Sequence, residues 1–429
     1  MKTILYPEKN IWNSLCKRPS MDNKDIEVVI REIIESVRSD KDKAVFHYSA
    51  KFDGASPENL KVSHTEIEEA TGQVSEKLKS AINVARSNIE KFHSAQLLAE
   101  PVIETSFGVK CWRKNVAIEK VGLYVPGGSA PLFSTVLMLG IPAKLAGCQE
   151  IIICTPPEKD GKVSPLILYT AHLIGITEIY KVGGAQAIAA MAFGTESIPK
   201  VYKIFGPGNQ YVTKAKELIQ QSGISIDMPA GPSEVLVIAD GTANAEFIAA
   251  DLLSQAEHGP DSQVVMLTDN QELISEVKAG LEKQLQQLPR KEIATKALEN
   301  TMLILLPSLD DCISFSNEYA PEHLIINVSD SGILAKKVIN AGSVFVGGFS
   351  CESAGDYASG TNHTLPTNGY ARSYSGVSTE SFLKKISFQE MNRDGVINLG
   401  PVIEIMAEAE SLYGHRNAMS IRLKSLQND

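Results

Sequence analysis

The sequence lacks the marks of exported and membrane-embedded proteins. No uninterrupted apolar run reaches the roughly 20 residues that a membrane-spanning helix requires. Residues 1–10 also lack the apolar core of a signal peptide. The six cysteines are scattered and include no CxxC pair, so neither a disulfide framework nor a thiolate metal site is indicated. We therefore expect a cytoplasmic protein with reduced thiols.

An excess of positive charge is also missing. The chain contains 51 acidic and 41 basic residues, which give a formal net charge of −10 with neutral histidines. Such a charge opposes binding to nucleic-acid phosphates or to acidic membrane surfaces. A small-molecule substrate is the expected partner, with no nucleic acid and no membrane.

The chain does have length and a change of pattern along it. Its 429 residues exceed the roughly 250 to 300 at which single cores stop growing, so at least two domains are expected. Apolar residues at helical spacing over 26–37, and a second helical pattern over 75–96, predict a mainly helical N-terminal quarter.

Beyond that quarter, short β-rich runs alternate with helical stretches. The runs end in Gly or Pro at 121–128, 150–157, 178–184 and 200–208, and a similar alternation restarts after 226–233. This pattern is typical of parallel sheets with helices on their faces. We therefore predict an α/β protein with two tandem α/β domains, each with a parallel sheet, plus small helical N- and C-terminal segments. The predicted divisions are an N-terminal arm (1–21), a first α/β domain with most of the metal and catalytic residues (22–123 and 233–377), a second α/β domain (124–232) and a C-terminal helical tail (378–429).

Glycine turns follow three of the expected strands, at 127–128, 183–184 and 206–208. Each opens a helix, whose N-terminal backbone amides favour an anion such as a pyrophosphate. Turns from neighbouring parallel strands would lie along one sheet edge, where open α/β sheets bind ligands. None matches GxGxxG, and turn geometry alone explains these glycines equally well.

Gln255 and His258 lie one helical turn apart, just before a Gly-Pro that ends the expected helix. A histidine at a helix C-terminus can be purely structural. However, Asp356 lies in a Gly-rich segment and His415 follows an acidic helix. Together these four side chains suit Zn²⁺, with Mn²⁺ or Co²⁺ as possible substitutes. Their spacing over 160 residues cannot prove a shared site.

Glu322 and His323 follow a proline and precede a strand-like run. Both side chains can carry protons, and in an irregular turn both can border one cleft. A solvated loop explains the pair about as well.

Eight segments, taken together and in order, resemble the histidinol dehydrogenase family over most of the chain, with the weakest resemblance in the N-terminal quarter. They are VGLYVPGGSAPLFSTVLM, VGGAQAIAA, FGPGNQYVTKAK, DMPAGPSEVLVIAD, LLSQAEHGPDSQ, NEYAPEHL, GDYASGTNHTLPT and EAESLYGHRNA. The resemblance implies two incomplete Rossmann-like domains, the second of which binds NAD. It also implies an NAD-dependent zinc enzyme of histidine biosynthesis that oxidises L-histidinol through L-histidinal to L-histidine.

The resemblance also implies roles for individual residues. Zinc would chiefly hold the substrate. In the two oxidations so implied, His323 fits the general base that takes the alcohol proton, and Glu322 is placed to activate the water that adds to the aldehyde. The implied zinc ligands, which also contact substrate, are Gln255, His258, Asp356 and His415. The implied further substrate contacts are Ser233, His363 and Glu410 beside Glu322 and His323, and the implied NAD contacts are Tyr124, Gln186 and Asn209. The family forms a homodimer with interlocked terminal segments and shared active sites, so His415 would reach the partner's site.

Three other readings remain open at this point. A zinc-dependent hydrolase would use the same metal and the Glu-His pair to activate water, but it gives the glycine turns no role. A solute-binding protein with two α/β lobes is usually exported, which the missing signal peptide opposes. A paralogous dehydrogenase acting on another amino alcohol would share every motif.

Overall fold

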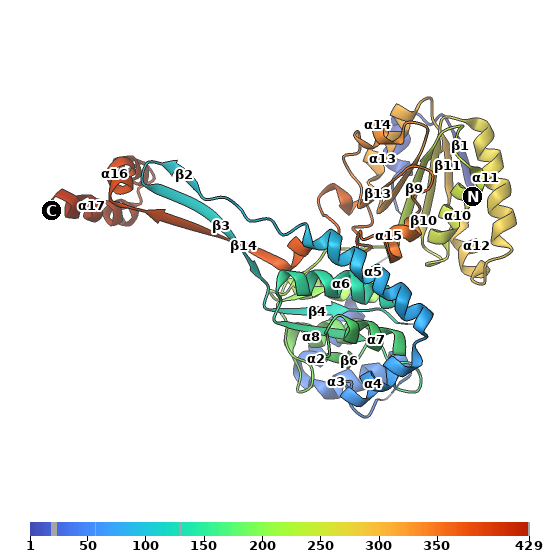
Figure 1. Cartoon of the computed structure of the whole chain (residues 1–429), viewed down its shortest axis with the longest axis horizontal. Helices are drawn as coiled ribbons and strands as arrows, with labels where there is room; N and C mark the ends of the chain where they lie inside the picture. Colours follow the sequence, from blue (N-terminus) through green and yellow to red (C-terminus); the bar gives the residue numbers. More distant parts are fainter. Residues whose placement is uncertain (19–23, 56, 128–130, 428–429) are drawn as a thin grey trace.

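The computed structural model describes residues 1–18, 24–55, 57–127 and 131–427. The expected boundary at 21–22 and Gly128 of the first glycine turn therefore lie outside the described residues. The chain forms two parallel sheets covered by helices, and a third, antiparallel sheet within a long arm (Figure 1). Among the described residues, no helix is long and apolar enough to cross a membrane.

The first unit is a six-stranded parallel sheet of order β1-β11-β10-β9-β12-β13. Neighbouring residues of a strand face opposite sides. Val235 and Val237 therefore pack under α10, α11 and α12, while Leu236 and Ile238 pack under α1 and α13. The elements of this unit are β1 (Lys2–Leu5), α1 (Lys9–Leu15), β9 (Glu234–Ala239), α10 (Ala245–Ala256), β10 (Gln263–Thr268), α11 (Gln271–Leu285), α12 (Lys291–Glu299), β11 (Met302–Leu305), α13 (Leu309–Tyr319), β12 (His323–Asn327), α14 (Ser331–Ala335), β13 (Ser343–Val346) and α15 (Glu352–Tyr357).

The second unit is a five-stranded parallel sheet of order β6-β5-β4-β7-β8. One face packs against α2, α3, α8 and α9, and the other against α4, α6 and α7, with α5 outside α6. The elements are α2 (Lys24–Asp40), α3 (Asp42–Tyr48), the π-helical turn η1 (Ser49–Asp53), α4 (His64–Gln73), α5 (Glu76–Ser94), β4 (Lys120–Tyr124), α6 (Phe133–Ala146), β5 (Glu150–Thr155), α7 (Pro165–Leu173), β6 (Ile179–Lys181), α8 (Gly184–Phe193), β7 (Lys203–Phe205), α9 (Gln210–Gln220) and β8 (Ser225–Ile226).

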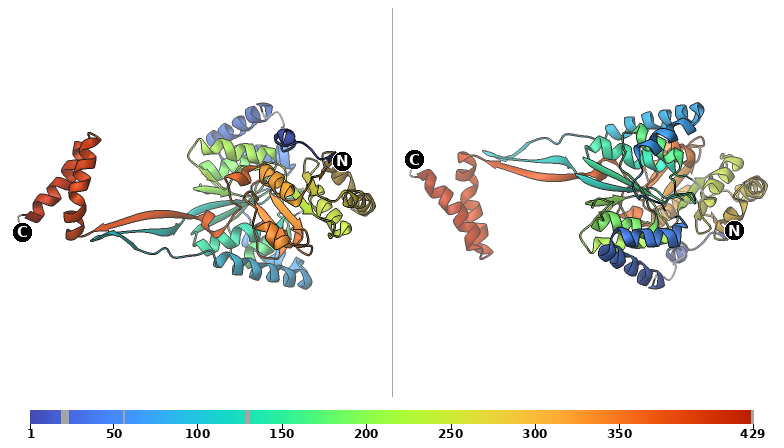
Figure 2. Two further views of the ribbon diagram at one scale, coloured as in Figure 1. Left: turned by 90° about the horizontal axis from the view of Figure 1, so that it is seen from above. Right: turned by 90° about the horizontal axis from the view of Figure 1, so that it is seen from below.

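The third part is an arm that extends away from both units, as both views in Figure 2 show. It contains an antiparallel sheet of order β14-β3-β2 and ends in two packed helices. Its elements are β2 (Ile103–Ser106), β3 (Val109–Ala117), β14 (Leu383–Met391), α16 (Arg393–Ala409) and α17 (Tyr413–Gln427), and short 3₁₀ turns η2 (Tyr370–Arg372) and η3 (Thr379–Phe382) precede β14.

The prediction of an α/β protein with two parallel sheets is confirmed, but two details of the expected division are wrong. In the segment 22–123, helices α2, α3 and α4 pack on the five-stranded sheet, and α5 packs on α6 of the same unit and contacts the segment 233–377 at Ala358. The physical reason is that α8 of the five-stranded unit is apolar on all its faces and needs a cover, which the apolar stripe of α2 provides. In the segment 378–429, expected to be helical, residues Leu383–Met391 form a strand. Ile386 and Phe388 of that strand are 41% and 37% exposed and neither face of the strand is buried, so the sequence shows no sustained alternation of apolar and polar residues there.

Candidate active site

Glu322 and His323 lie where β12 begins, directly after the turn that ends α13. Ala320 closes that helix with a left-handed backbone (φ 54°), and the chain then enters the sheet. Glu322 and His323 are only 6% and 4% exposed, so the solvated-loop alternative is excluded. His323 pairs with Val235 of the adjacent strand β9.

One residue of β9 holds both side chains through its main chain. The amide of Glu234 donates to Glu322 Oε2 at 2.8 Å, and His323 Nδ1 lies 3.0 Å from the Glu234 carbonyl oxygen. Because a carbonyl oxygen only accepts, Nδ1 carries the proton of neutral His323. The other ring nitrogen, Nε2, lies 3.5 Å from Asp356 Oδ1.

The electrostatics of this pair follow from burial and from the nearby carboxylates. Burial raises the pKa of Glu322 to about 8. For His323, burial acts to lower the pKa, but Glu352, Glu322 and Asp356 outweigh it and raise the pKa well above its usual value. A cation bound among these carboxylates would oppose that increase.

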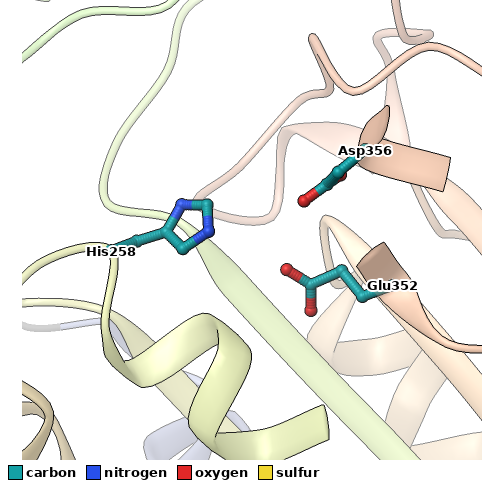
Figure 3. A group of neighbouring side chains, drawn as sticks. All are labelled: His258, Glu352 and Asp356. Atoms are coloured by element: carbon teal, nitrogen blue, oxygen red, sulfur yellow. The ribbon is translucent and has the colours of Figure 1, made fainter. Parts of the chain in front are cut away.

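A candidate metal centre lies beside the pair. One potential ligand atom from each of His258, Glu352 and Asp356 lies within 4.8 Å of the others. In Figure 3, the carboxylates of Glu352 and Asp356 both point toward the imidazole of His258. The two carboxylates lie one turn apart on α15, and His258 follows α10.

Unsatisfied polar atoms indicate that this cluster fits a cation. Both carboxylate oxygens of Glu352, which is 1% exposed, are buried without a hydrogen-bond partner among the described residues. The same holds for both polar atoms of the Gln255 side chain, one helical turn before His258. Buried polar groups are nearly always paired, so these atoms call for a ligand. Imidazole, carboxylate and amide oxygen suit Zn²⁺.

Glu352 is a residue that the sequence interpretation missed. Its spacing of four from Asp356 on a short helix was the available signal. Asp53, which lines the cavity of the five-stranded unit described below, was missed as well, because nothing in its surrounding sequence marks it.

Glu410 and His415 are not brought to this cluster by their own chain. Glu410 ends α16 and His415 lies in α17, both at the tip of the arm (Figures 1 and 2). Gln255, His258 and Asp356 belong to the six-stranded unit, whereas the arm joins the five-stranded unit. Within one chain, therefore, the predicted ligand set is brought together only in part.

His363 connects the two α/β units. Its Nδ1 donates to the Asp356 carbonyl oxygen at 3.0 Å, and its Nε2 lies 3.2 Å from the Thr135 hydroxyl of α6, which therefore donates to it. Burial lowers the pKa of His363, which favours this neutral form. Both nitrogens have protein partners, so a substrate contact by this residue stays a prediction. Ser233, another predicted substrate contact, directly precedes Glu234 and β9.

The three predicted NAD contacts line one cavity of about 580 Å³ in the five-stranded unit. The cavity lies where β4 ends, beside the N-termini of α8 and α9. Tyr124 accepts the Gly184 amide at 3.1 Å, and Asn209 Oδ1 caps α9 by accepting two backbone amides. Gln186 donates to Asp53 at 3.3 Å, whereas no residue within the described ranges hydrogen-bonds to its buried Oε1. A helix N-terminus and an unpaired amide oxygen suit a ligand with both phosphate and hydroxyl groups.

The chain is similar to histidinol dehydrogenases over its whole length. The sequence profile of the family described as histidinol dehydrogenase matches residues 16–423. A histidinol dehydrogenase of Bacteroides thetaiotaomicron is 56% identical over 427 residues, covering 100% of both chains. One of Vibrio vulnificus strain YJ016 is 50% identical over 431 residues, covering 99% of both chains.

Among solved structures, the chain is also similar to a histidinol dehydrogenase. The crystal structure of histidinol dehydrogenase from Elizabethkingia anophelis is 57% identical, with a TM-score of 0.97 over 100% of this chain and 99% of that chain. An acetylating aldehyde dehydrogenase from Geobacillus thermoglucosidasius is similar in fold alone, with 13% identity and a TM-score of 0.50 over 89% of this chain and 94% of that chain.

Proposed function

This chain belongs to the histidinol dehydrogenase family and is an oxidoreductase, and we propose that it oxidises L-histidinol through L-histidinal to L-histidine with NAD⁺ and zinc. The observation that carries this proposal is the buried pair of Glu322 and His323 beside the His258, Glu352 and Asp356 cluster. His363 and Thr135 connect that cluster to the unit with the cofactor cavity. The predicted absence of nucleic-acid and membrane partners, and the cytoplasmic location, stay predictions.

Zinc would be held by Gln255, His258 and Asp356, with Glu352 beside them. Bound there, zinc would hold and orient the substrate by its imidazole and amino nitrogens and would polarise the substrate's alcohol oxygen. Support comes from the unpartnered polar atoms of Gln255 and Glu352.

NAD⁺ would occupy the cavity between Tyr124, Gln186 and Asn209, where it supplies the hydride acceptor. Gly184 and Asn209 open α8 and α9, so backbone amides there can meet its phosphates. The cavity also argues against the hydrolase alternative, which would leave it without a role.

The protein's own groups perform the proton transfers. Because Nδ1 of His323 donates to the Glu234 carbonyl, Nε2 is the nitrogen that accepts the alcohol proton. The second oxidation requires water to add to the aldehyde. Glu322 accepts the proton of that water at Oε1, since Oε2 is held by the Glu234 amide.

A second copy of this chain would complete the site. Along α16 and α17 of the arm, Ile405, Met406, Tyr413 and Ile421 are each more than half exposed. Such a row of apolar side chains is typical of an interface. If the arm crosses to a partner, the partner's His415 and Glu410 can reach the zinc and substrate of this chain.

The direct test counts NADH formed per L-histidinol at limiting substrate and excess NAD⁺, before and after chelation and zinc return. A ratio near two, lost on chelation and restored by zinc, is expected for two successive hydride transfers. A ratio near one would remove the role given to Glu322. Faster turnover of another amino alcohol than of L-histidinol would favour the paralogous enzyme.

A further inference from the structure

Glu234 occupies a central position behind the proton-carrying pair. It is the first residue of β9, is fully buried, and contacts Glu322 through its amide and His323 through its carbonyl. A small rotation of this one peptide segment would move both hydrogen bonds at once. What fixes Glu234 therefore fixes the orientation of the pair.

The Glu234 side chain points to a second set of partners. Arg18 donates to it through two nitrogens, Nε to Oε1 at 2.9 Å and Nη2 to Oε2 at 2.8 Å. The backbone amide of Asn368 donates to Oε1 at 2.7 Å. The Arg18 and Glu234 side chains are 7% and 0% exposed. Two parallel hydrogen bonds to a carboxylate fix its plane as well as its position.

Arg18 is itself held on its other sides. Its Nη1 donates to the Cys16 carbonyl at 2.9 Å, and its guanidinium carbon lies 3.6 Å from the ring centre of buried Tyr319. Burial acts to lower the pKa of Arg18, but the hydrogen bond with Glu234 and the charge interactions with Tyr319, Glu234 and Cys16 together outweigh it and raise the pKa above its usual value. The guanidinium therefore stays charged.

Stability alone does not account for this arrangement. A buried ion pair is often no more stabilising than apolar side chains of similar volume, so its advantage lies in geometric precision. We propose that Arg18 and Glu234 are positioning residues for Glu322 and His323, with Arg18 fixing the Glu234 side chain and thereby the peptide groups that orient the pair. This proposal rests on the proposed function of that pair. It gives the N-terminal segment, which is remote in sequence from every predicted site residue, a role in the reaction.

The test is Arg18→Ala in the full-length zinc enzyme. The metal ligands on α10 and α15 are untouched, so zinc content and the KM for L-histidinol should stay near wild type. Misplaced proton carriers should lower kcat on the order of 10- to 100-fold. Guanidinium at non-denaturing concentration can fill the vacated space and should restore part of kcat. Arg18→Lys keeps the charge but not the paired donors, so its kcat should be intermediate.

A matched control lies in the same N-terminal segment. Lys9 pairs with Asp311 at the surface at 3.2 Å, and Lys9→Ala should leave kcat unchanged. If Lys9→Ala lowered kcat as much as Arg18→Ala does, a general loosening of the segment would replace positioning.

A readout independent of turnover separates this proposal from the proposed function. Nitrogen-15 NMR of histidine in the metal-free protein, with His323→Gln to assign the signal, should find the Nδ1–H of His323 in the hydrogen bond to the Glu234 carbonyl in wild type. Arg18→Ala should shift that Nδ1–H signal, because the carbonyl that accepts the proton is no longer fixed. A folded Arg18→Ala protein with the wild-type His323 signal and wild-type kcat would overturn the positioning role. Failure of wild type to oxidise L-histidinol would instead refute the proposed function and leave the NMR result standing.

Discussion

Glu322 Oε2 and His323 Nδ1 lie 3.6 Å apart. The backbone amide of Glu234 holds the first atom and the backbone carbonyl of Glu234 holds the second. The arrangement divides the proton chemistry, because it leaves a carboxylate oxygen and an imidazole nitrogen, Nε2, to accept protons separately. Two successive oxidations at one site require such a division, since the second involves a water molecule that the first does not.

Glu322→Gln should therefore impair mainly the second oxidation. The amide cannot accept a proton from water, so kcat for L-histidinal should fall on the order of 10²- to 10⁴-fold. Oxidation of L-histidinol to the aldehyde should stay measurable in single-turnover experiments. His323→Gln is the matched comparison, because it should impair both steps. If Glu322→Gln abolished the first hydride transfer while L-histidinal was still oxidised, the assigned roles would be wrong.

The oxidation of L-histidinal should depend on pH through Glu322. Burial raises the pKa of this carboxyl to about 8, so below that pH it is mostly protonated and cannot act as a base. The rate should therefore rise with pH through the pKa of Glu322, which bound zinc would lower from about 8, and level off above it. Stopped-flow rates from L-histidinal at several pH values test this, and Glu322→Gln should lose that rise. A rise that persists in the variant would assign the ionisation to another group.

Glu352 should contribute to metal binding although the sequence interpretation passed over it. Glu352→Gln keeps the shape and removes the charge, so zinc affinity should fall on the order of 10- to 100-fold. His258→Ala, which removes a predicted ligand, should lower zinc content and substrate affinity more strongly. Competition with a zinc chelator, followed by metal analysis, measures both. Wild-type zinc affinity in Glu352→Gln would remove Glu352 from the site.

The course of the chain explains which features the sequence revealed. Alternating strand and helix patterns predicted both parallel sheets, because buried strands such as Glu234–Ala239 are bounded by clear turn residues. Glu352 and Asp53 were missed because each gains its chemistry from partners distant in sequence. The orientation of Glu322 and His323 was equally unreadable, since it depends on Glu234, 88 and 89 residues away.

A buried ion pair should support the cofactor cavity. Lys216 and Asp227 contact each other, and each binds one backbone group of Gly206. Lys216 donates to the Gly206 carbonyl oxygen at 2.8 Å, and the Gly206 amide donates to Asp227 at 2.7 Å. Lys216→Met leaves a buried carboxylate unpaired, which should cost about 3 to 5 kcal/mol in urea unfolding and raise the KM for NAD⁺. Adding Asp227→Leu should recover much of the stability without restoring the KM. An unchanged KM in both variants would disconnect this pair from cofactor binding.

Exchange of the arm between two subunits can be tested by pairing two inactive variants. His258→Ala and His415→Ala should each be nearly inactive. In a dimer containing one of each, one site collects both substitutions, while the other combines the intact His258 of one chain with the intact His415 of its partner. Random pairing gives such dimers half of the time, so co-expression should yield about one quarter of wild-type activity from isologous dimers. If instead His415 served its own chain, every site would carry one substitution and co-expression would recover nothing. Separately purified variants mixed without unfolding are the control, because interlocked arms should hinder exchange and keep that mixture inactive.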